Sequence, residues 1–215
     1  MPGCVAAIST AWAYIIGGDL PAAVEQYQLG LRLAQSVGAK RFEVLTLSQL
    51  AYLQFKDDPS TAMVMAQTAM ELMPKFAQRF FGPPVLSSMA TLVNQTDEQD
   101  RLLGKGEALL ADGCVSHCYF KFYADAIVLM LARGDYAAAV GYADALEAYV
   151  REEPLELMAL TTEQARLVRA LADGEQGEQL DARVARFNQR LRATDFVNSM
   201  AGQPLAQLAG PFSIR

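Results

Sequence analysis

The residues best suited to chemistry are two cysteines and a histidine that lie close together as Cys114-x-x-His117-Cys118. Two thiolates and an imidazole could supply three of the four ligands of a tetrahedral zinc ion. The sequence offers no second Cys-x-x-Cys pair for the fourth ligand, and the adjacent residues His117 and Cys118 would point about 100° apart on a helix. We therefore predict no metal and no cofactor, and a structural turn in which His117 caps a helix or packs between helices.

A nucleophilic mechanism would also depend on His117, because the sequence contains one histidine. Such a mechanism needs a general base that a third group, usually a carboxylate, holds in place. Ser116 and Cys118 flank the histidine, but no pattern in the sequence places a carboxylate beside it. We therefore predict no catalytic residues and expect that the chain is not an enzyme.

Aromatic side chains follow the histidine at Tyr119, Phe120, Phe122 and Tyr123. One face of a helix cannot bury all four, since successive residues are turned by about 100°. One or two of these rings should therefore face a groove or the neighbouring helix pair, although packing in the core is the favoured interpretation of the cluster. The residues predicted to bind a partner are His117, Tyr119, Phe122 and Tyr123.

These residues belong to an apolar helical pattern over 117–131, and a second such pattern follows over 138–149. Apolar residues recur every three or four positions in both, which predicts one buried stripe on each helix. Between the patterns, Gly134 can end the first helix and Asp135 can accept hydrogen bonds from the amides that open the second. Two amphipathic helices joined by so short a turn should fold back antiparallel.

The same turn occurs near the start of the chain, where residues 18–24 (GDLPAAV) match residues 134–140 (GDYAAAV) at five of seven positions. A weaker copy begins at Asp58, 39 positions after Asp19, and Asp135 follows Asp19 by 116 positions, close to three such steps. A period of roughly 35 to 45 residues with two helices per unit is typical of an α-solenoid. We predict an all-α helical repeat domain over residues 1–197 and a loosely packed or extended tail over 198–215.

Three local expectations accompany this pattern. The first helix should turn an apolar stripe toward the core, made of Val5, Ile8, Trp12 and Ile15/Ile16. Residues 74–84, which contain three prolines, should form a break between helices. Thr96 should cap the helix that follows, with Gln99 in capping-box register.

Composition places the chain among soluble globular proteins, with 215 residues, 52% of them hydrophobic, and a net charge of −6. An acidic chain is a poor partner for nucleic acid, because phosphate binding draws on clustered basic residues. No apolar run reaches the ~18 residues that cross a bilayer, and the apolar segment 5–16 lacks the basic flank of a secretory signal. Three cysteines without framework spacing favour a reducing compartment. We expect a cytoplasmic protein that binds neither nucleic acid nor membranes.

The unit Trp12…Gly18-Asp19-x-x-x-Ala23-x-x-x-Tyr27 resembles a tetratricopeptide repeat, with a small residue at the helix crossing and an aromatic residue four positions later. Further segments are similar to the C-terminal tetratricopeptide region of large bacterial class III adenylate/guanylate cyclases that also carry an ATPase domain. They are 38–43 (GAKRFE), 81–83 (FGP), 107–117 (EALLADGCVSH), 122–126 (FYADA) and 142–155 (YADALEAYVREEPL). The similarity covers about residues 5–173 and is strongest over 107–155.

The resemblance adds to the predicted fold, which becomes a tetratricopeptide-like α-solenoid: a right-handed superhelix of four to five antiparallel hairpins. Those cyclases carry cyclase and ATPase domains ahead of this region. The present sequence contains neither a Gly-x-x-x-x-Gly-Lys-Ser/Thr loop nor an aspartate pair suited to cyclisation. The resemblance therefore implies a regulatory or interaction segment and not nucleotide chemistry.

We predict a non-catalytic interaction or sensor module that binds a peptide or protein in a groove lined by the first helix of each pair. One alternative is a small-molecule receptor that holds an apolar ligand inside the superhelix, near 80–81 and 119–123. Another is a homo-oligomerisation scaffold, for instance a homodimer through residues 5–16 or through Phe187 and Leu191. Three arginines share a face of the last helix, which is either solvated or turned toward an acidic partner: Arg183, Arg186 and Arg190.

Overall fold

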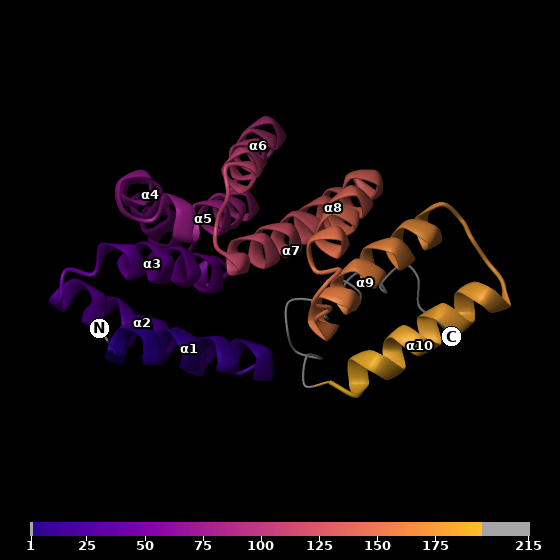
Figure 1. The fold of residues 1–215 in the computed structure, drawn as a ribbon, viewed down its shortest axis with the longest axis horizontal. Helices are drawn as coiled ribbons and strands as arrows, with labels where there is room; N and C mark the ends of the chain where they lie inside the picture. The colour runs from indigo at the N-terminus through magenta and orange to yellow at the C-terminus, as the bar shows by residue number, and fades with distance from the viewer. Residues whose placement is uncertain (1, 195–215) are drawn as a thin grey trace. The chain divides into compact units, whose positions relative to one another are not determined.

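The computed structural model describes residues 2–194, and this part of the chain is all-α (Figure 1). Its ten helices pack as consecutive antiparallel hairpins in a tetratricopeptide-like array, as predicted. The helices are α1 (Pro2–Gly17), α2 (Leu20–Ser36), α3 (Lys40–Gln54), α4 (Pro59–Phe76), α5 (Gln78–Leu92), α6 (Thr96–Ala111), α7 (Ser116–Arg133), α8 (Tyr136–Tyr149), α9 (Glu156–Ala172) and α10 (Glu178–Arg192). The tail predicted over 198–215 lies outside the described residues.

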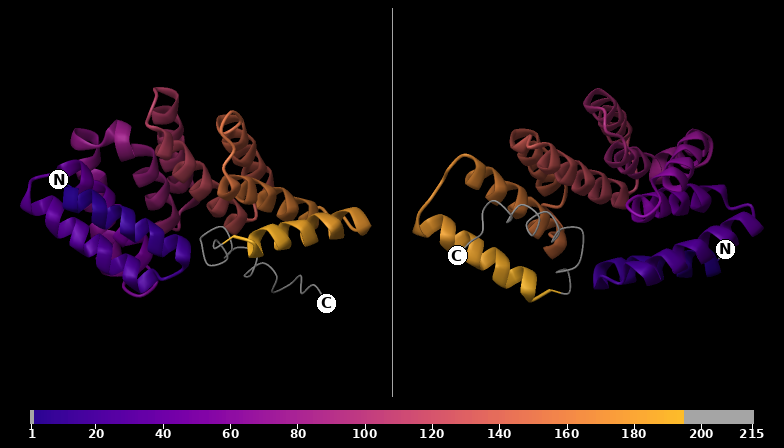
Figure 2. Two further views of the ribbon diagram at one scale, coloured as in Figure 1. Left: turned by 60° about the horizontal axis from the view of Figure 1, so that its bottom comes forward. Right: turned by 180° about the vertical axis from the view of Figure 1, so that it is seen from behind.

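The chain divides into two compact units at a boundary within α7. The first unit holds Met1–Ile15 and Asp19–Phe122, and the second holds Ile16–Gly18 and Tyr123–Arg215. In the first unit α3 packs against α2, α4 and α5, and α5 also packs against α6. In the second unit α9 packs against both α8 and α10. The helices α9 and α10 run antiparallel, as the right-hand view of Figure 2 shows.

The repeated turn forms as the sequence predicts. Asp19, Asp58 and Asp135 each precede a second helix, and each carboxylate accepts a hydrogen bond from the amide three residues later, at 3.0 to 3.1 Å. Gly18 and Gly134 hold positive φ angles of 80° and 74°, which residues with a side chain rarely adopt. Glycine ends the first helix and aspartate caps the second, so the short pattern fixes the turn.

The predicted stripe of α1 is partly wrong. Ile8 and Ile15 are buried, but Val5 and Trp12 are 45% and 38% exposed. The helix instead turns small side chains toward α2, where the Cys4 thiol donates to the carbonyl of Gly30 at 3.5 Å. Close approach of two backbones favours such small residues over large ones. A homodimer through α1 therefore stays a prediction, because this helix keeps an exposed apolar face.

A break between helices lies within 74–84, as expected, but it is confined to Ala77, because α4 continues to Phe76 and α5 begins at Gln78. Pro83 and Pro84 lie inside α5 and are buried. The expected capping box is wrong. Thr96 is the first residue of α6 and not its cap, and the Gln99 side chain donates to the carbonyl of Val93 at 2.8 Å. The glutamine therefore ties α6 to the connection that precedes it.

Each unit has apolar clusters between its helices. In the first unit, one cluster joins α3, α4 and α5 through Ala51, Ala62, Ala66 and Leu92. In the second, α9 and α10 share a cluster that contains Leu160, Leu167 and Phe187, with Leu191 packed against it. Phe187 is 2% exposed, so in this structure it faces α9 and is not available to a second copy. Among the described helices, none is long and apolar enough to cross a membrane.

Candidate functional site

Two consecutive prolines in α5 leave two backbone carbonyls without their usual helical partners. In an α-helix each carbonyl accepts a hydrogen bond from the amide four residues later, and proline has no amide hydrogen to donate. Pro83 and Pro84 therefore free the carbonyls of Arg79 and Phe80. Arg79 and Phe80 are exposed residues, so these carbonyls can accept from water or from donors in another part of the chain.

The start of α7 supplies them. The Val115 amide donates to the Arg79 carbonyl at 3.4 Å. The Phe80 carbonyl lies 2.8 Å from Nε2 of His117 and 3.0 Å from the Cys118 thiol, which donates to it. The imidazole also stacks on the neighbouring ring of Phe81, with centroids 5.2 Å apart. The turn motif and the proline pair are thus two halves of one hydrogen-bonded joint.

The chemistry of the cysteines agrees with a structural role. Burial raises the pKa of the Cys118 thiol to about 12, and burial also raises the pKa of the Cys114 thiol. Both sulfurs therefore stay protonated at neutral pH and act as donors, Cys114 to the carbonyl of Leu109 at 3.3 Å. A protonated thiol is a poor nucleophile and a poor metal ligand. Within residues 2–194 no cluster of three histidine, cysteine or acidic side chains could hold a metal ion.

We expect His117→Ala to lower the free energy of unfolding by about 1 to 2 kcal/mol, since the Phe80 carbonyl loses one donor. In a Pro84→Ala background the new amide of residue 84 can donate to the same carbonyl, so the cost of His117→Ala should fall. Urea denaturation of the four proteins in this double-mutant cycle measures the difference. An equal cost in both backgrounds would contradict the joint described here.

The four residues predicted to bind a partner lie in different environments. His117 is exposed on α7, beside Phe81. Tyr119 is partly buried, and its hydroxyl donates to the carbonyl of Leu110 at the end of α6, at 2.8 Å. Phe122 is fully buried. Tyr123 begins the second unit, where its ring lies 6.4 Å from that of Tyr142 on α8.

This placement separates the predicted residues. Phe122 offers no surface to a partner in this structure, and the Tyr119 hydroxyl is already bound within the chain. Phe122 therefore packs in the core. His117 keeps an exposed side and is the residue of the four that a partner can reach most directly.

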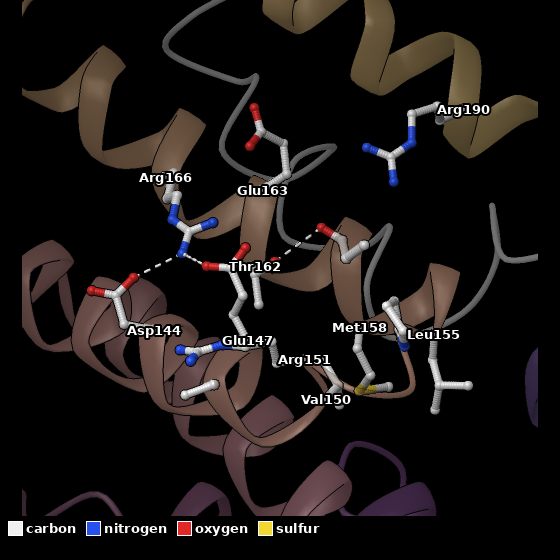
Figure 3. A pocket seen from close by; sticks show the side chains of 13 residues that line it. Asp144, Glu147, Val150, Arg151, Leu155, Met158, Thr162, Glu163, Arg166 and Arg190 are labelled. Atoms are coloured by element: carbon white, nitrogen blue, oxygen red, sulfur yellow. Dashed lines mark hydrogen bonds and ion pairs between the residues drawn. The ribbon is translucent and has the colours of Figure 1, made fainter.

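A pocket of about 600 Å³ lies in the second unit, among α8, the α8–α9 connection, α9 and the end of α10 (Figure 3). Its apolar lining comes from Ala148, Val150, Pro154, Leu155, Met158 and Ala159. Leu155 is exposed, whereas Met158 is buried. The pocket thus presents an apolar floor that is open to solvent.

Charged side chains form the rim of this pocket. Arg166 donates to Asp144 at 2.8 Å and to Glu147 at 2.5 Å, so one guanidinium joins two turns of α8 to α9 (Figure 3). On the other side, Arg190 of α10 makes two parallel bonds to Glu156, at 2.9 and 3.0 Å. Paired bonds of this kind fix a guanidinium in place. The rim is therefore held by ion pairs around an apolar centre.

No local pattern in the sequence predicts the pocket. The arginines of α10 were expected to be solvated or to meet an acidic partner, but Arg183 and Arg190 bind Glu163 and Glu156 of α9 instead. These pairs are separated by 20 and 34 residues, which no helical periodicity spans. A signal that could have found them is the row of acidic residues on α9 at a spacing of seven, which matches the spacing of the arginines.

No protein-family model, curated protein or solved structure matches this chain.

Proposed function

We propose that this chain is a non-catalytic interaction module that binds a peptide or a segment of another protein. The observation that supports this most is the pocket of the second unit, with its apolar floor and its rim of ion pairs. Protein interfaces commonly combine an apolar centre with a polar rim. An apolar side chain of the partner would enter above Met158 while its backbone crosses the rim.

The rim would also favour ordered binding. Arg166 and Arg190 are already held by carboxylates, so little side-chain freedom would be lost when a partner binds. Arg151 lines the same pocket and makes no ion pair with the described residues. It could therefore pair with a carboxylate of the partner beside the apolar anchor.

The sequence resemblance to the C-terminal region of bacterial class III cyclases supports a regulatory use of such binding. In this proposal the array does not act on nucleotides but receives a protein segment. The finer assignment to a cyclase-type regulator rests on the sequence motifs over about residues 5–173, of which those over 107–155 are the strongest.

Selection of peptides from a displayed random library on the purified chain would test this proposal. Selected peptides should bind at least tenfold more weakly to Ala159→Phe, which fills the pocket, and to Leu155→Ser, which removes apolar rim surface. Leu29→Ser is the matched control, because Leu29 is a similarly exposed leucine on α2. Calorimetric titration measures each affinity. Peptides that bind all three variants as they bind the unmodified chain would contradict the proposal.

A second candidate is a small-molecule receptor, because a pocket of about 600 Å³ falls within the range that holds drug-sized ligands. In this proposal the ligand would bind in the pocket of the second unit and not near residues 80–81 and 119–123, where the sequence analysis placed it. A thermal-shift screen with amphipathic compounds separates the candidates. Compounds that stabilise the unmodified chain but not Ala159→Phe, in the absence of any selected peptide, would favour the receptor.

A further inference from the structure

Three helices of the first unit begin next to one another. The ring of Phe42, in the first turn of α3, lies 6.4 Å from the ring of Phe81 near the start of α5. Phe81 in turn lies 5.2 Å from the imidazole of His117, in the first turn of α7. The amino-terminal ends of α3, α5 and α7 therefore form one continuous edge, which we call the α3–α5–α7 edge.

An arginine is held in place on this edge by two aromatic rings. The guanidinium carbon of Arg41 lies 4.2 Å from the ring centroid of Phe80 and 5.3 Å from that of Phe42. Phe80 comes from α5 and is 41% exposed, so the stack lies at the surface. Stacking on a ring satisfies the face of the guanidinium and leaves the N–H groups at its edge able to donate.

The edge carries positive charge that the described residues do not neutralise. Lys40 is paired with Glu43 at 2.7 Å. Arg41 and Arg79 form no ion pair with any residue of the 2–194 part. A chain with a net charge of −6 thus has a local surface of the opposite sign.

The helix starts add to this charge. The residues that precede α3 and α5 are Ala39 and Ala77, and neither makes a side-chain capping bond. The amides of Phe42 and Glu43 already donate to the Ala39 carbonyl, and those of Phe80 and Phe81 donate to the Ala77 carbonyl. Both helix starts still carry part of the positive end of the helix dipole, which favours an anionic group at the same edge as Arg41.

We propose that the α3–α5–α7 edge, formed by Arg41, Phe42, Arg79, Phe80 and His117, docks an acidic linear segment of a partner protein. Carboxylates of that segment would accept bonds from the two arginines, and an apolar side chain between them would lie on Phe80. Arginine and aromatic residues are the types that contribute most at protein interfaces. The edge lies in the first unit and the pocket in the second, so this inference is independent of the proposed function.

The probe is a fluorescein-labelled, glutamate-rich peptide that contains one phenylalanine, with a glutamine-for-glutamate version as its counterpart. Fluorescence anisotropy with the full chain should show binding of the glutamate peptide that weakens as salt is added. Arg41→Gln and Arg79→Gln should each reduce its affinity about tenfold, the loss expected for one charge-assisted hydrogen bond. Arg41→Lys, which keeps the charge but loses the planar fork, should fall between.

The matched control is Arg186→Gln on α10, which removes an equally charged, exposed arginine that pairs with no described residue. It should bind the glutamate peptide as the unmodified chain does. Circular dichroism melts confirm that each variant is folded. Since Arg79 is exposed and unstacked, Arg79→Gln keeps the test available if Arg41→Gln is unstable.

Three results would overturn the proposal. One is equal binding of the glutamine peptide, or an equal loss from Arg186→Gln. Another is displacement of the peptide by a single-stranded oligonucleotide that binds more tightly and needs Arg41, which would assign the edge to nucleic acid. The third is a dimer in light scattering that Arg41→Gln dissociates, which would assign the edge to a second copy of the chain.

Discussion

Phe122→Ala should lower the free energy of unfolding by about 3 to 5 kcal/mol, the usual cost of removing a buried aromatic ring. The ring is fully buried at the end of the first unit, and it packs so closely on Gly106 of α6 that no side chain would fit between them. Urea denaturation followed by circular dichroism measures the loss.

Phe76→Ala provides the matched control for this substitution, because the Phe76 ring is 46% exposed at the end of α4. We expect a small change there, since little apolar surface leaves the interior. Equal losses for the two alanine variants would show that Phe122 does not act as a core residue. A partner-binding role for Phe122 would instead leave stability unchanged and reduce affinity alone.

Gly106→Ala should destabilise the chain by about 2 kcal/mol, although alanine is the better helix former. A Cβ atom at residue 106 would lie 2.2 Å from Cε2 and 2.9 Å from Cδ2 of Phe122. The buried ring cannot move aside, so the overpacking should cost about 3 kcal/mol. The gain in helix propensity, about 1 kcal/mol, offsets only part of this.

Gly104→Ala separates these two effects within the same helix. Among residues 2–194, no atom outside the adjacent backbone of α6 lies within 4 Å of a Cβ built at residue 104, so the variant keeps the propensity gain and adds no overlap. Thermal melts should therefore move in opposite directions, upward for Gly104→Ala and downward for Gly106→Ala. A shared direction would mean that the contact between Gly106 and Phe122 is looser than described.

The repeated hairpins could be predicted because their signals are local. An aspartate that caps a helix binds an amide three residues away, as Asp19, Asp58 and Asp135 do. Glycine with positive φ marks the same turns. Such short-range chemistry is readable in any copy of the repeat, so the all-α hairpin array follows from the sequence.

Periodicity was less informative about which face of a helix is buried. In α1 the large residues Val5 and Trp12 share a helical stripe with Ile8, and this stripe predicts the side of the helix that faces the core. The helix packs instead through small residues that let α1 approach Gly30 of α2. A hydrophobic pattern draws attention to large apolar side chains. Close packing of two helices favours small side chains instead.

The candidate surfaces depend on pairs that are distant in the sequence. The sequence predicts binding roles for residues 80–81 and for His117, but the hydrogen bond between His117 and the carbonyl of Phe80, which Pro84 frees, joins residues 37 positions apart. The docking role proposed for Arg41 depends on its contact with the ring of Phe80, which belongs to another hairpin. Ion pairs such as Arg190 with Glu156 likewise connect separate helices. These contacts depend on tertiary packing, which local propensity does not encode.

The proline pair of α5 also bears on the order in which the chain is assembled. During synthesis α5 and α6 emerge before residues 115–118, so the carbonyls of Arg79 and Phe80 must first be bound by water. They exchange that water for the Val115 amide, His117 and Cys118 only when the start of α7 arrives. The α5–α6 hairpin is thus completed by the helix that follows it.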